Sequence, residues 1–175
     1  MGGFMPIDKL CHRCRAYLRP VDGLHGWLGC SCGTRRRDKP VITLEQYITA
    51  SGKYKERIND PELTEEVKDN AVILLNKVNQ LLEELKITKV TVSSGFRPSA
   101  VNAATKGSAK KSLHMTGMAV DLADPKNEIG RLILTRPDLL KKYGLWLEDI
   151  ASTPTWCHLD CSPTRKDREL RVFKV

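Results

Sequence analysis

Between residues 67 and 85, apolar side chains recur at alternating steps of four and three, which places them on one face of a helix. The members of this stripe are Val67, Ala71, Leu74, Val78, Leu81 and Leu85. Because the stripe covers fewer than three heptads, it predicts a helix packed on a core rather than a coiled coil.

Two other segments have helical signals. Thr43 followed by Gln46 three residues later has the form of a capping box, which predicts a short helix through about Ala50. The segment 127–143 has a helical pattern that Pro137 interrupts. We therefore expect one long helix with shorter helices before and after it.

Strand patterns fall between and after these helices. Residues 89–93 alternate between apolar and polar side chains, which predicts a strand with Val90 and Val92 facing inward. Further strands are expected at 118–123, 145–147 and 156–161. Residues 97–113, rich in small and polar side chains, predict a long loop, and Trp156 is interpreted as a core residue. Helices and strands that do not alternate regularly favour an α+β domain.

Composition narrows the class of protein. Hydrophobic residues make up 41% of the chain and charged residues 29%, as in soluble globular proteins. The net charge of +8 favours anionic partners, such as nucleic acid, teichoic acid or a membrane surface. No apolar run approaches the length of about 18 residues that a spanning helix needs. The N-terminus lacks a basic stretch followed by an apolar core, so we expect no secretory signal and synthesis in the cytoplasm.

Residues 1–40 differ from residues 41–175, and we expect two parts divided there. The first part holds four of the six cysteines, Cys11, Cys14, Cys30 and Cys32, in a spacing that resembles a zinc ribbon. Four thiolates can close a tetrahedral structural zinc site, which would explain how so small a segment folds. Disulfides or free thiols are the alternative, although cytosolic thiols more often bind metal. The nearby basic run Arg35-Arg36-Arg37 supports nucleic-acid binding as a weaker hypothesis, because such runs are more often merely solvated.

The segment 112–121 carries the most informative chemistry. It places His114 and Asp121 on either side of Gly117, which permits a tight turn where a loop runs into a strand. Imidazole nitrogen and carboxylate oxygen are both good zinc ligands. Outside the cysteine-rich segment His158 is the one remaining histidine, and it is the candidate for the third protein ligand. A fourth position would then stay open to water, as in catalytic zinc sites.

These motifs resemble a known family. The pattern Ser-x-His-x-x-Gly-x-Ala-x-Asp, followed by Trp-x-His-x-Asp, is similar to that of the D-Ala-D-Ala carboxypeptidase and hedgehog-like superfamily of zinc peptidases. The upstream segment 93–98 is similar to the Ser-Gly-Tyr-Arg segment of those enzymes. The resemblance covers roughly residues 43–175. It implies a small antiparallel sheet flanked by helices.

The resemblance also implies roles for individual residues. The matching positions bind zinc in that family, which assigns one catalytic zinc ion to His114, Asp121 and His158. The matching arginine helps to hold the substrate and the charge that develops on the scissile carbonyl, which is the role implied for Arg97. Ser112 is a candidate substrate contact. The family's substrates are mostly short peptides of the bacterial cell wall, so the implied partners are peptidoglycan stem peptides.

One position departs from the family pattern. Hydrolysis needs a carboxylate to accept a proton from water and pass it to the leaving amine. Many members carry it three residues before the last zinc histidine, where this chain has Thr155. The candidates to replace it are Asp160, which is slightly favoured, and Glu148 or its neighbour Asp149. Asp160 has the alternative role of orienting His158 through a hydrogen bond.

Together these observations predict a zinc-dependent peptidoglycan peptidase, either a carboxypeptidase or an endopeptidase. The small size, the basic charge and the lack of a signal suit a phage-encoded lysin or a virion-associated enzyme that is released by lysis. Virion proteins are then possible partners. The alternative is a catalytically inactive, zinc-stabilised binding or virion structural module with the same fold, and Thr155 supports it.

Overall fold

The computed structural model describes residues 40–163, 165 and 170–174, together with the backbone of three short strands nearer the N-terminus. These strands are β1 (Arg19–Pro20), β2 (Trp27–Gly29) and β3 (Arg35–Arg37), and they form an antiparallel sheet in that order. The four cysteines at positions 11, 14, 30 and 32 lie outside the described residues. The structural zinc site therefore stays a prediction.

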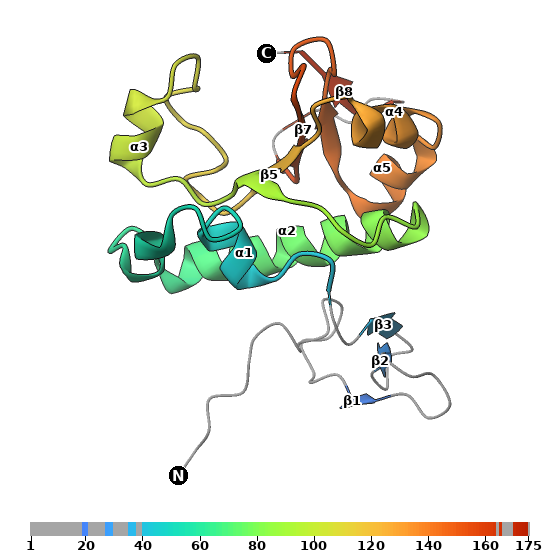
Figure 1. Cartoon of the computed structure of the whole chain (residues 1–175), viewed down its shortest axis with the longest axis horizontal. Coiled ribbons are helices and arrows are strands. Elements are labelled where there is room, and N and C mark those ends of the chain that lie inside the picture. The colour runs from blue at the N-terminus through green and yellow to red at the C-terminus, as the bar shows by residue number, and fades with distance from the viewer. Residues whose placement is uncertain are drawn as a thin grey trace.

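A five-stranded sheet lies at the centre of the remaining fold (Figure 1). Its strands are β4 (Val92–Ser94), β5 (Ala119–Ala123), β6 (Trp146–Glu148), β7 (Trp156–Asp160) and β8 (Val172–Phe173). They lie in the order β4-β5-β7-β6-β8, and all neighbours are antiparallel except β6 and β8. The α+β prediction is confirmed. The expectation of a purely antiparallel sheet is wrong at the β8 edge, because the chain leaves β7, passes β6 and pairs with the far side of β6.

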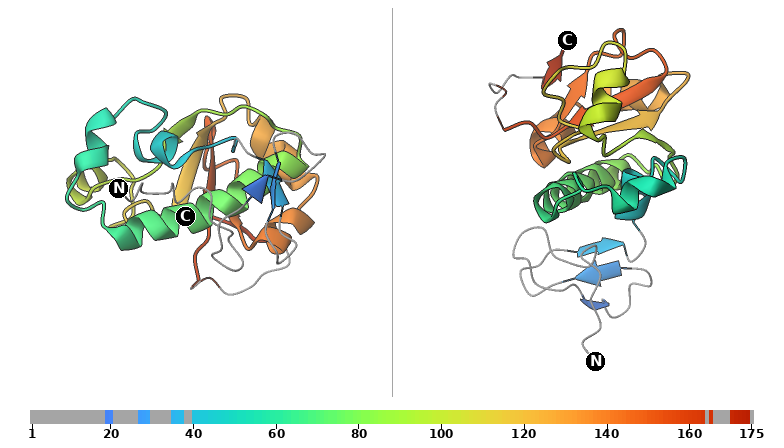
Figure 2. Two further views of the ribbon diagram at one scale, coloured as in Figure 1. Left: turned by 90° about the horizontal axis from the view of Figure 1, so that it is seen from below. Right: turned by 90° about the vertical axis from the view of Figure 1, so that its left-hand side faces the viewer.

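The long helix α2 (Glu65–Glu84) covers one face of this sheet (Figure 2). Its first turn carries Glu65 and Glu66, which interact favourably with the helix dipole, and the Thr64 hydroxyl accepts a hydrogen bond from the Val67 amide. The helix buries Ala71, Leu74, Leu75, Asn76, Val78, Leu81 and Leu82, so the predicted apolar face is confirmed. Each fully buried leucine contributes roughly 1.5–3 kcal/mol to folding.

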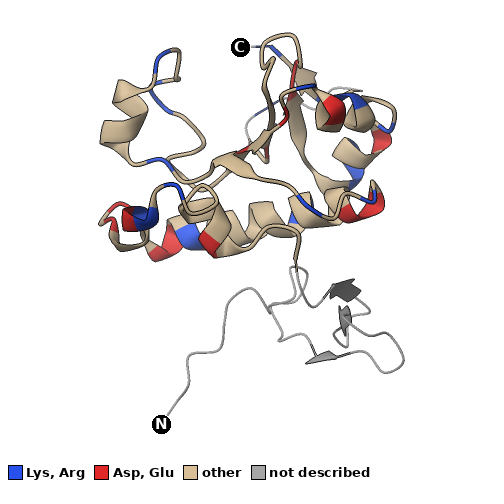
Figure 3. Ribbon diagram, viewed as in Figure 1, with Lys and Arg blue, Asp and Glu red and all other residues tan. Residues whose placement is uncertain are grey.

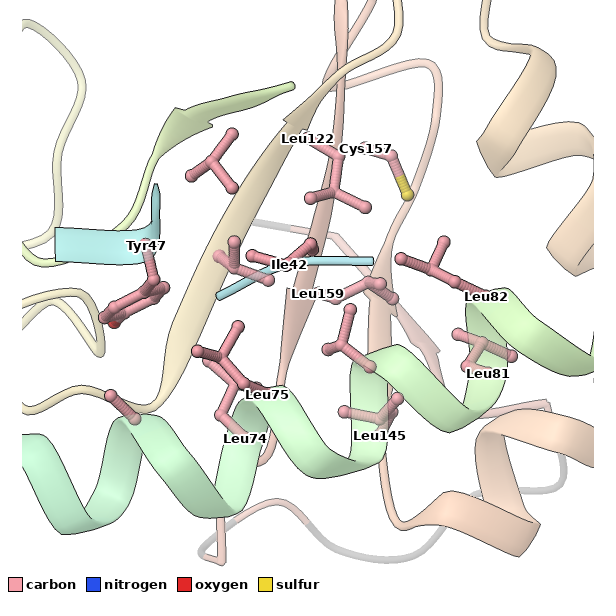
Figure 4. Packing of buried hydrophobic residues seen from close by; sticks show 14 of the residues in the cluster. Ile42, Tyr47, Leu74, Leu75, Leu81, Leu82, Leu122, Leu145, Cys157 and Leu159 are labelled. Carbon is pink, nitrogen blue, oxygen red and sulfur yellow. The ribbon is translucent and has the colours of Figure 1, made fainter. Parts of the chain in front are cut away.

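The two faces of β7 have different environments. Cys157 and Leu159 are buried in the core beneath the sheet, where they pack with the apolar face of α2 (Figure 4). Trp156, His158 and Asp160 alternate with them and therefore point to the opposite face. The sheet thus has one face that forms the core and one that carries polar chemistry.

Helix α1 (Leu44–Ile48) begins with the predicted capping box, in which Thr43 and Gln46 bond each other's backbone amides. Its Tyr47 side chain is buried, and the hydroxyl donates to the Ala119 carbonyl at 3.1 Å. A Cβ atom at Gly95 would lie 1.9 Å from the Tyr47 carbonyl oxygen, so only glycine allows β4 to approach α1 this closely. The short 3-10 helix η2 (Lys55–Asn59) connects α1 to the segment before α2.

The predicted loop at 97–113 contains a helix, α3 (Ser99–Ala104), so that prediction is wrong for its first half. The start of α3 lacks a local side-chain cap. Instead Glu62 accepts hydrogen bonds from the Ser99 amide and hydroxyl, at 2.9 and 2.6 Å. This partner lies 37 positions away in sequence, where a local pattern cannot identify it.

Most of the remaining elements follow the predicted pattern. Helices α4 (Glu128–Leu134) and α5 (Asp138–Tyr143) are separated at Pro137, as expected. The strand expected from residue 89 begins only at Val92. None of the helices within the described residues is long and apolar enough to cross a membrane.

Candidate metal centre

Strands β5 and β7 bring two of the predicted ligands together. Asp121 and His158 are direct partners in the antiparallel ladder, so their side chains leave the same face of the sheet. The third, His114, lies on the segment that enters β5. Gly117, between His114 and the strand, has φ +78°, and a Cβ atom there would lie 2.3 Å from the Val67 carbonyl oxygen. The predicted turn glycine is therefore required by the packing on α2.

The three side chains converge on one point. The Asp121 carboxylate lies 2.6 Å from His158 Nδ1 through one oxygen and 3.3 Å from His114 Nε2 through the other. One donor atom from each residue lies within 4.8 Å of the other two. Within the described part of the chain, this is the group of side chains that could hold a metal ion.

His114 is held in the orientation of a metal ligand. Its ring is 3% exposed, and Nδ1 lies 2.8 Å from the Gly95 carbonyl oxygen. Because a carbonyl oxygen only accepts, Nδ1 carries the proton and donates it. Nε2 faces the Asp121 carboxylate and is the ring atom that a metal at this point would meet.

The electrostatics of the other two ligands are coupled. Burial opposes a charge on His158, but hydrogen bonds to Asp121 and Asp160 outweigh it and raise its pKa to about 9. Burial likewise opposes the charge on Asp121, yet the neighbouring histidines hold its pKa well below the usual range. Without metal, His158 thus carries a proton that a cation at this point would displace. A nitrogen, oxygen and nitrogen donor set fits zinc and leaves a fourth position open.

Asp160 lies beyond His158, and both of its carboxylate oxygens accept hydrogen bonds. It is 0% exposed, and its carboxylate accepts from the Ser162 amide at 3.0 Å and from the Arg165 guanidinium at 2.8 Å. His158 Nε2 lies 3.6 Å from the same carboxylate. Burial disfavours the charge, but these hydrogen bonds outweigh it and lower the pKa of Asp160. This is the geometry of a carboxylate that orients a histidine.

Glu148 has a different environment. It ends β6, one residue beyond the pairing of Leu147 with Leu159, and so lies beside His158 on the neighbouring strand. It is half-buried, and burial raises the pKa of its carboxyl group. Among the described residues, none forms a hydrogen bond or an ion pair with it. Asp149 points elsewhere, toward the Ala151 amide and Lys174.

Arg97 approaches the centre from the end of β4. It is 8% exposed, and its guanidinium lies 3.7 Å from the Asp121 carboxylate and 3.4 Å from the Asn102 side-chain oxygen. Its backbone amide donates to the His114 carbonyl at 3.2 Å. Ser112 accepts a hydrogen bond from the His114 amide at 3.4 Å.

A cavity of about 340 Å³ lies over this group. The sequence-predicted residues that line it are Arg97, Ser112, His114, Asp121, Glu148, His158 and Asp160. Thr155 does not line this cavity; it lines a neighbouring one of about 360 Å³. The fold therefore brings the predicted site residues of residues 41–175 into one place, with the exception of Asp149.

Some lining residues were not identified from the sequence. Trp156 is half-exposed and lines both cavities, so its interpretation as a core residue is wrong. Its alternation with His158 and Asp160 was a usable signal for this position. Arg165 and Phe173 gave no such signal, because their approach depends on how the chain returns after β7; the Arg165 guanidinium stacks 3.4 Å from the Phe173 ring centre.

Comparison with protein families identifies the chain independently. Residues 42–146 match the model of the family described as Peptidase M15. The matched segment includes Arg97, Ser112, His114 and Asp121. It ends before Glu148 and His158, so the match does not test these two residues. No curated protein and no solved structure matched the chain. Because the match covers more than half of the 175 residues and agrees with the motif resemblance, the chain belongs to the peptidase M15 family of zinc peptidases.

Proposed function

We propose that this protein is a zinc-dependent peptidase that hydrolyses peptide bonds in the stem peptides of bacterial peptidoglycan. One observation carries the proposal: the three metal-ligand candidates share a cavity with the guanidinium of Arg97 and with the Glu148 carboxylate, which has no ion-pair partner among the described residues. A ligand set without an available carboxylate could bind metal and do nothing more. The combination supplies the groups that peptide hydrolysis needs.

His114, Asp121 and His158 would hold the zinc ion. Zinc at such a site supplies a Lewis acid, which polarises a carbonyl group and lowers the pKa of water from about 15.7 to about 7. The chain's own contribution is the fixed orientation of the three donors, set by the Gly95 carbonyl, the β5–β7 register and Asp160.

Glu148 is the best candidate for the general base. A base needs a free lone pair and a pKa that burial has moved toward the working pH, and Glu148 has both. Asp160 is less suitable because Ser162 and Arg165 already occupy its oxygens. We therefore assign proton transfer to Glu148 and the orientation of His158 to Asp160. Glu148 would then take the role of the carboxylate that many family members carry at the position of Thr155.

The proton path follows from this assignment. The Glu148 carboxylate accepts a proton from water as the water oxygen attacks the scissile carbonyl carbon, and later donates that proton to the nitrogen of the leaving amine. Arg97 donates hydrogen bonds to the carbonyl oxygen as negative charge develops there. Ser112, at the cavity wall, contacts the peptide.

The cavity continues past the metal centre, which favours an endopeptidase over a carboxypeptidase. Arg97, Thr105, Asp121 and Trp156 line both the cavity over the metal centre and its neighbour. A peptide could therefore extend on both sides of the scissile bond. A carboxypeptidase would instead need a wall that stops the chain one residue beyond that bond.

The inactive binding or virion module remains the alternative function. Thr155 supports it, because the usual position of the base is vacant. The free carboxylate of Glu148 in the same cavity weighs against it. The phage origin and virion association stay predictions from size, charge and the N-terminal sequence.

Two isosteric variants test the assignment of the base. We expect Glu148→Gln to lower kcat by about 10²–10⁴-fold on a purified muropeptide while zinc stoichiometry stays unchanged. We expect Asp160→Asn to weaken zinc affinity by about 10–100-fold and to recover most of its activity at saturating zinc. Product formation is followed by mass spectrometry and zinc affinity by competition with a chelator.

The reverse pattern would contradict the assignment. If Asp160→Asn loses kcat at saturating zinc while Glu148→Gln keeps it, then Asp160 is the base. If the zinc-loaded wild type binds muropeptides but releases no product from any of them, the inactive alternative replaces the proposal.

A further inference from the structure

The loop between α3 and Ser112, residues 105–111, forms one wall of the cavity over the metal centre. Lys106 and Lys111 of this loop line the cavity, and Lys110, between them, does not. In Figure 3, the blue segments after α3 mark this basic loop. Three lysines lie within six positions here, yet only two of them face the metal centre.

The other positive charges in the cavity are already neutralised. Arg97 lies beside Asp121, and Arg165 forms an ion pair with Asp160 at 2.8 Å. Among the described residues, no acidic side chain pairs with Lys106 or Lys111. Apart from the two histidines, the cavity is lined by four cationic and three acidic side chains, so it favours a negatively charged ligand even before a divalent metal adds to its charge.

The loop is anchored by Asn102, which is 3% exposed. The Asn102 amide donates to the Ala109 carbonyl at 2.9 Å, and its backbone carbonyl accepts from the Ser108 hydroxyl at 2.6 Å. The same side chain accepts from Arg97. The backbone that carries the lysines is therefore fixed relative to the guanidinium at the metal centre. Their ammonium groups remain exposed at the end of flexible stems.

We propose that Lys106 and Lys111 bind a free carboxylate of the substrate, so that the enzyme prefers peptides with a carboxylate close to the scissile bond over the same peptides with a carboxamide. The proposal rests on the proposed function. A carboxylate is the anion that a peptide brings to such a site, and unpaired ammonium groups recognise it by charge. The carboxylate could belong to a side chain or to the C-terminus, and the experiment separates these two sources.

The test compares three forms of one stem peptide: all carboxylates free, the side-chain carboxylate amidated, and the C-terminus amidated. We expect the wild type to cleave the free peptide with a kcat/KM about tenfold above that of one amidated form, chiefly through KM. The amidated form that is cleaved with the lower kcat/KM identifies the carboxylate that the two lysines bind. The difference should shrink at high salt, since exposed charges are screened.

Two double variants of equal charge separate the site from general electrostatics. Lys106→Gln with Lys111→Gln should cleave the free and amidated peptides equally, at the rate of the wild type on the amidated form. Lys110→Gln with Lys141→Gln removes the same charge outside the cavity, from the loop and from α5, and should keep the wild-type preference. Equal cleavage of all three peptides by the wild type, or equal losses in the two double variants, would overturn the proposal.

Binding measurements keep this test separate from the proposed function. Calorimetric titration of zinc-loaded Glu148→Gln with each peptide should give about tenfold tighter binding of the free form, and the cavity double variant should abolish that difference. If the wild type cleaves nothing but the binding preference is present, the proposed function fails and the carboxylate site stands. If cleavage occurs without any preference in binding or in KM, the carboxylate site fails and the function stands.

Discussion

The two sides of the cavity over the metal centre differ in how their polar groups are held. On the metal side, each polar group has a partner. The Gly95 carbonyl accepts from His114, Asp121 contacts His114 and His158, and Arg165 donates to Asp160. On the facing side, which is the loop at 105–111, Lys106 and Lys111 have no ion-pair partner among the described residues. The same holds for Glu148, which lies beside His158 on β6, and all three side chains line the same cavity. The groups that would bind one ion in one geometry are held by fixed contacts, whereas the proposed base and the two lysines proposed to bind a carboxylate are not.

The largest effect is expected from Asp121→Asn. This change keeps the size of the side chain but removes the charge that contacts both histidines and Arg97. Zinc affinity should fall by more than the roughly 100-fold that follows loss of an outer hydrogen-bond partner. Metal analysis of the purified protein measures this. Glu148→Gln, which removes a carboxylate that is not among the three metal-ligand candidates, is the matched control and should retain one zinc at the site. Equal zinc loss in both variants would contradict the division.

Replacing a glycine by alanine should weaken zinc binding on the metal side of the cavity but not on the facing side. At Gly95 a Cβ atom would lie 1.9 Å from the Tyr47 carbonyl oxygen, so the backbone that holds His114 must move. We expect a loss of about 1–3 kcal/mol in the free energy of unfolding and about 10–100-fold weaker zinc binding.

Gly107 is the matched position on the facing side. It has φ +77°, and a Cβ atom there meets nothing within 4 Å. The alanine variant should lose about 1–2 kcal/mol from the left-handed backbone and bind zinc normally. Denaturant unfolding and zinc competition report both quantities, and weakened zinc binding in Gly107→Ala would show that the two sides are not independent.

A smaller effect concerns pH. Without metal, His158 keeps its proton up to its pKa of about 9, and zinc must displace that proton at any lower pH. Zinc affinity should therefore rise about tenfold per pH unit between about pH 7 and 8.5, where an ordinary histidine would already be neutral. Competition titrations with a chelator of known pH dependence measure this. A flat affinity over that interval would show that Asp121 and Asp160 do not hold His158 protonated.

The elements that could be predicted from the sequence are those with local causes. The apolar stripe of α2 and the capping box of α1 each lie within a few helical turns, and both are confirmed. Helix α3 was missed because its cap comes from Glu62, and β8 because two residues carry no periodic signal. Both depend on contacts between segments far apart in the chain.

The candidate site divides in the same way. The positions of His114 and Asp121 are encoded in a short motif around a turn glycine, and His158 follows from the small number of histidines. The choice between Asp160 and Glu148 could not be made from the sequence, because it depends on the order of β6 and β7 and on the approach of Arg165. The anchoring of the 105–111 loop by Asn102 likewise appears only in the fold.

The central claim is that the metal side and the facing side together form a zinc-dependent peptidase. Its most direct test is digestion of purified muropeptides by the zinc-loaded protein, after removal of metal by a chelator, and after zinc is added back. We expect new peptide products in the first reaction, none in the second and their return in the third. Products that persist without metal, or no products under any condition while zinc is bound, would contradict it.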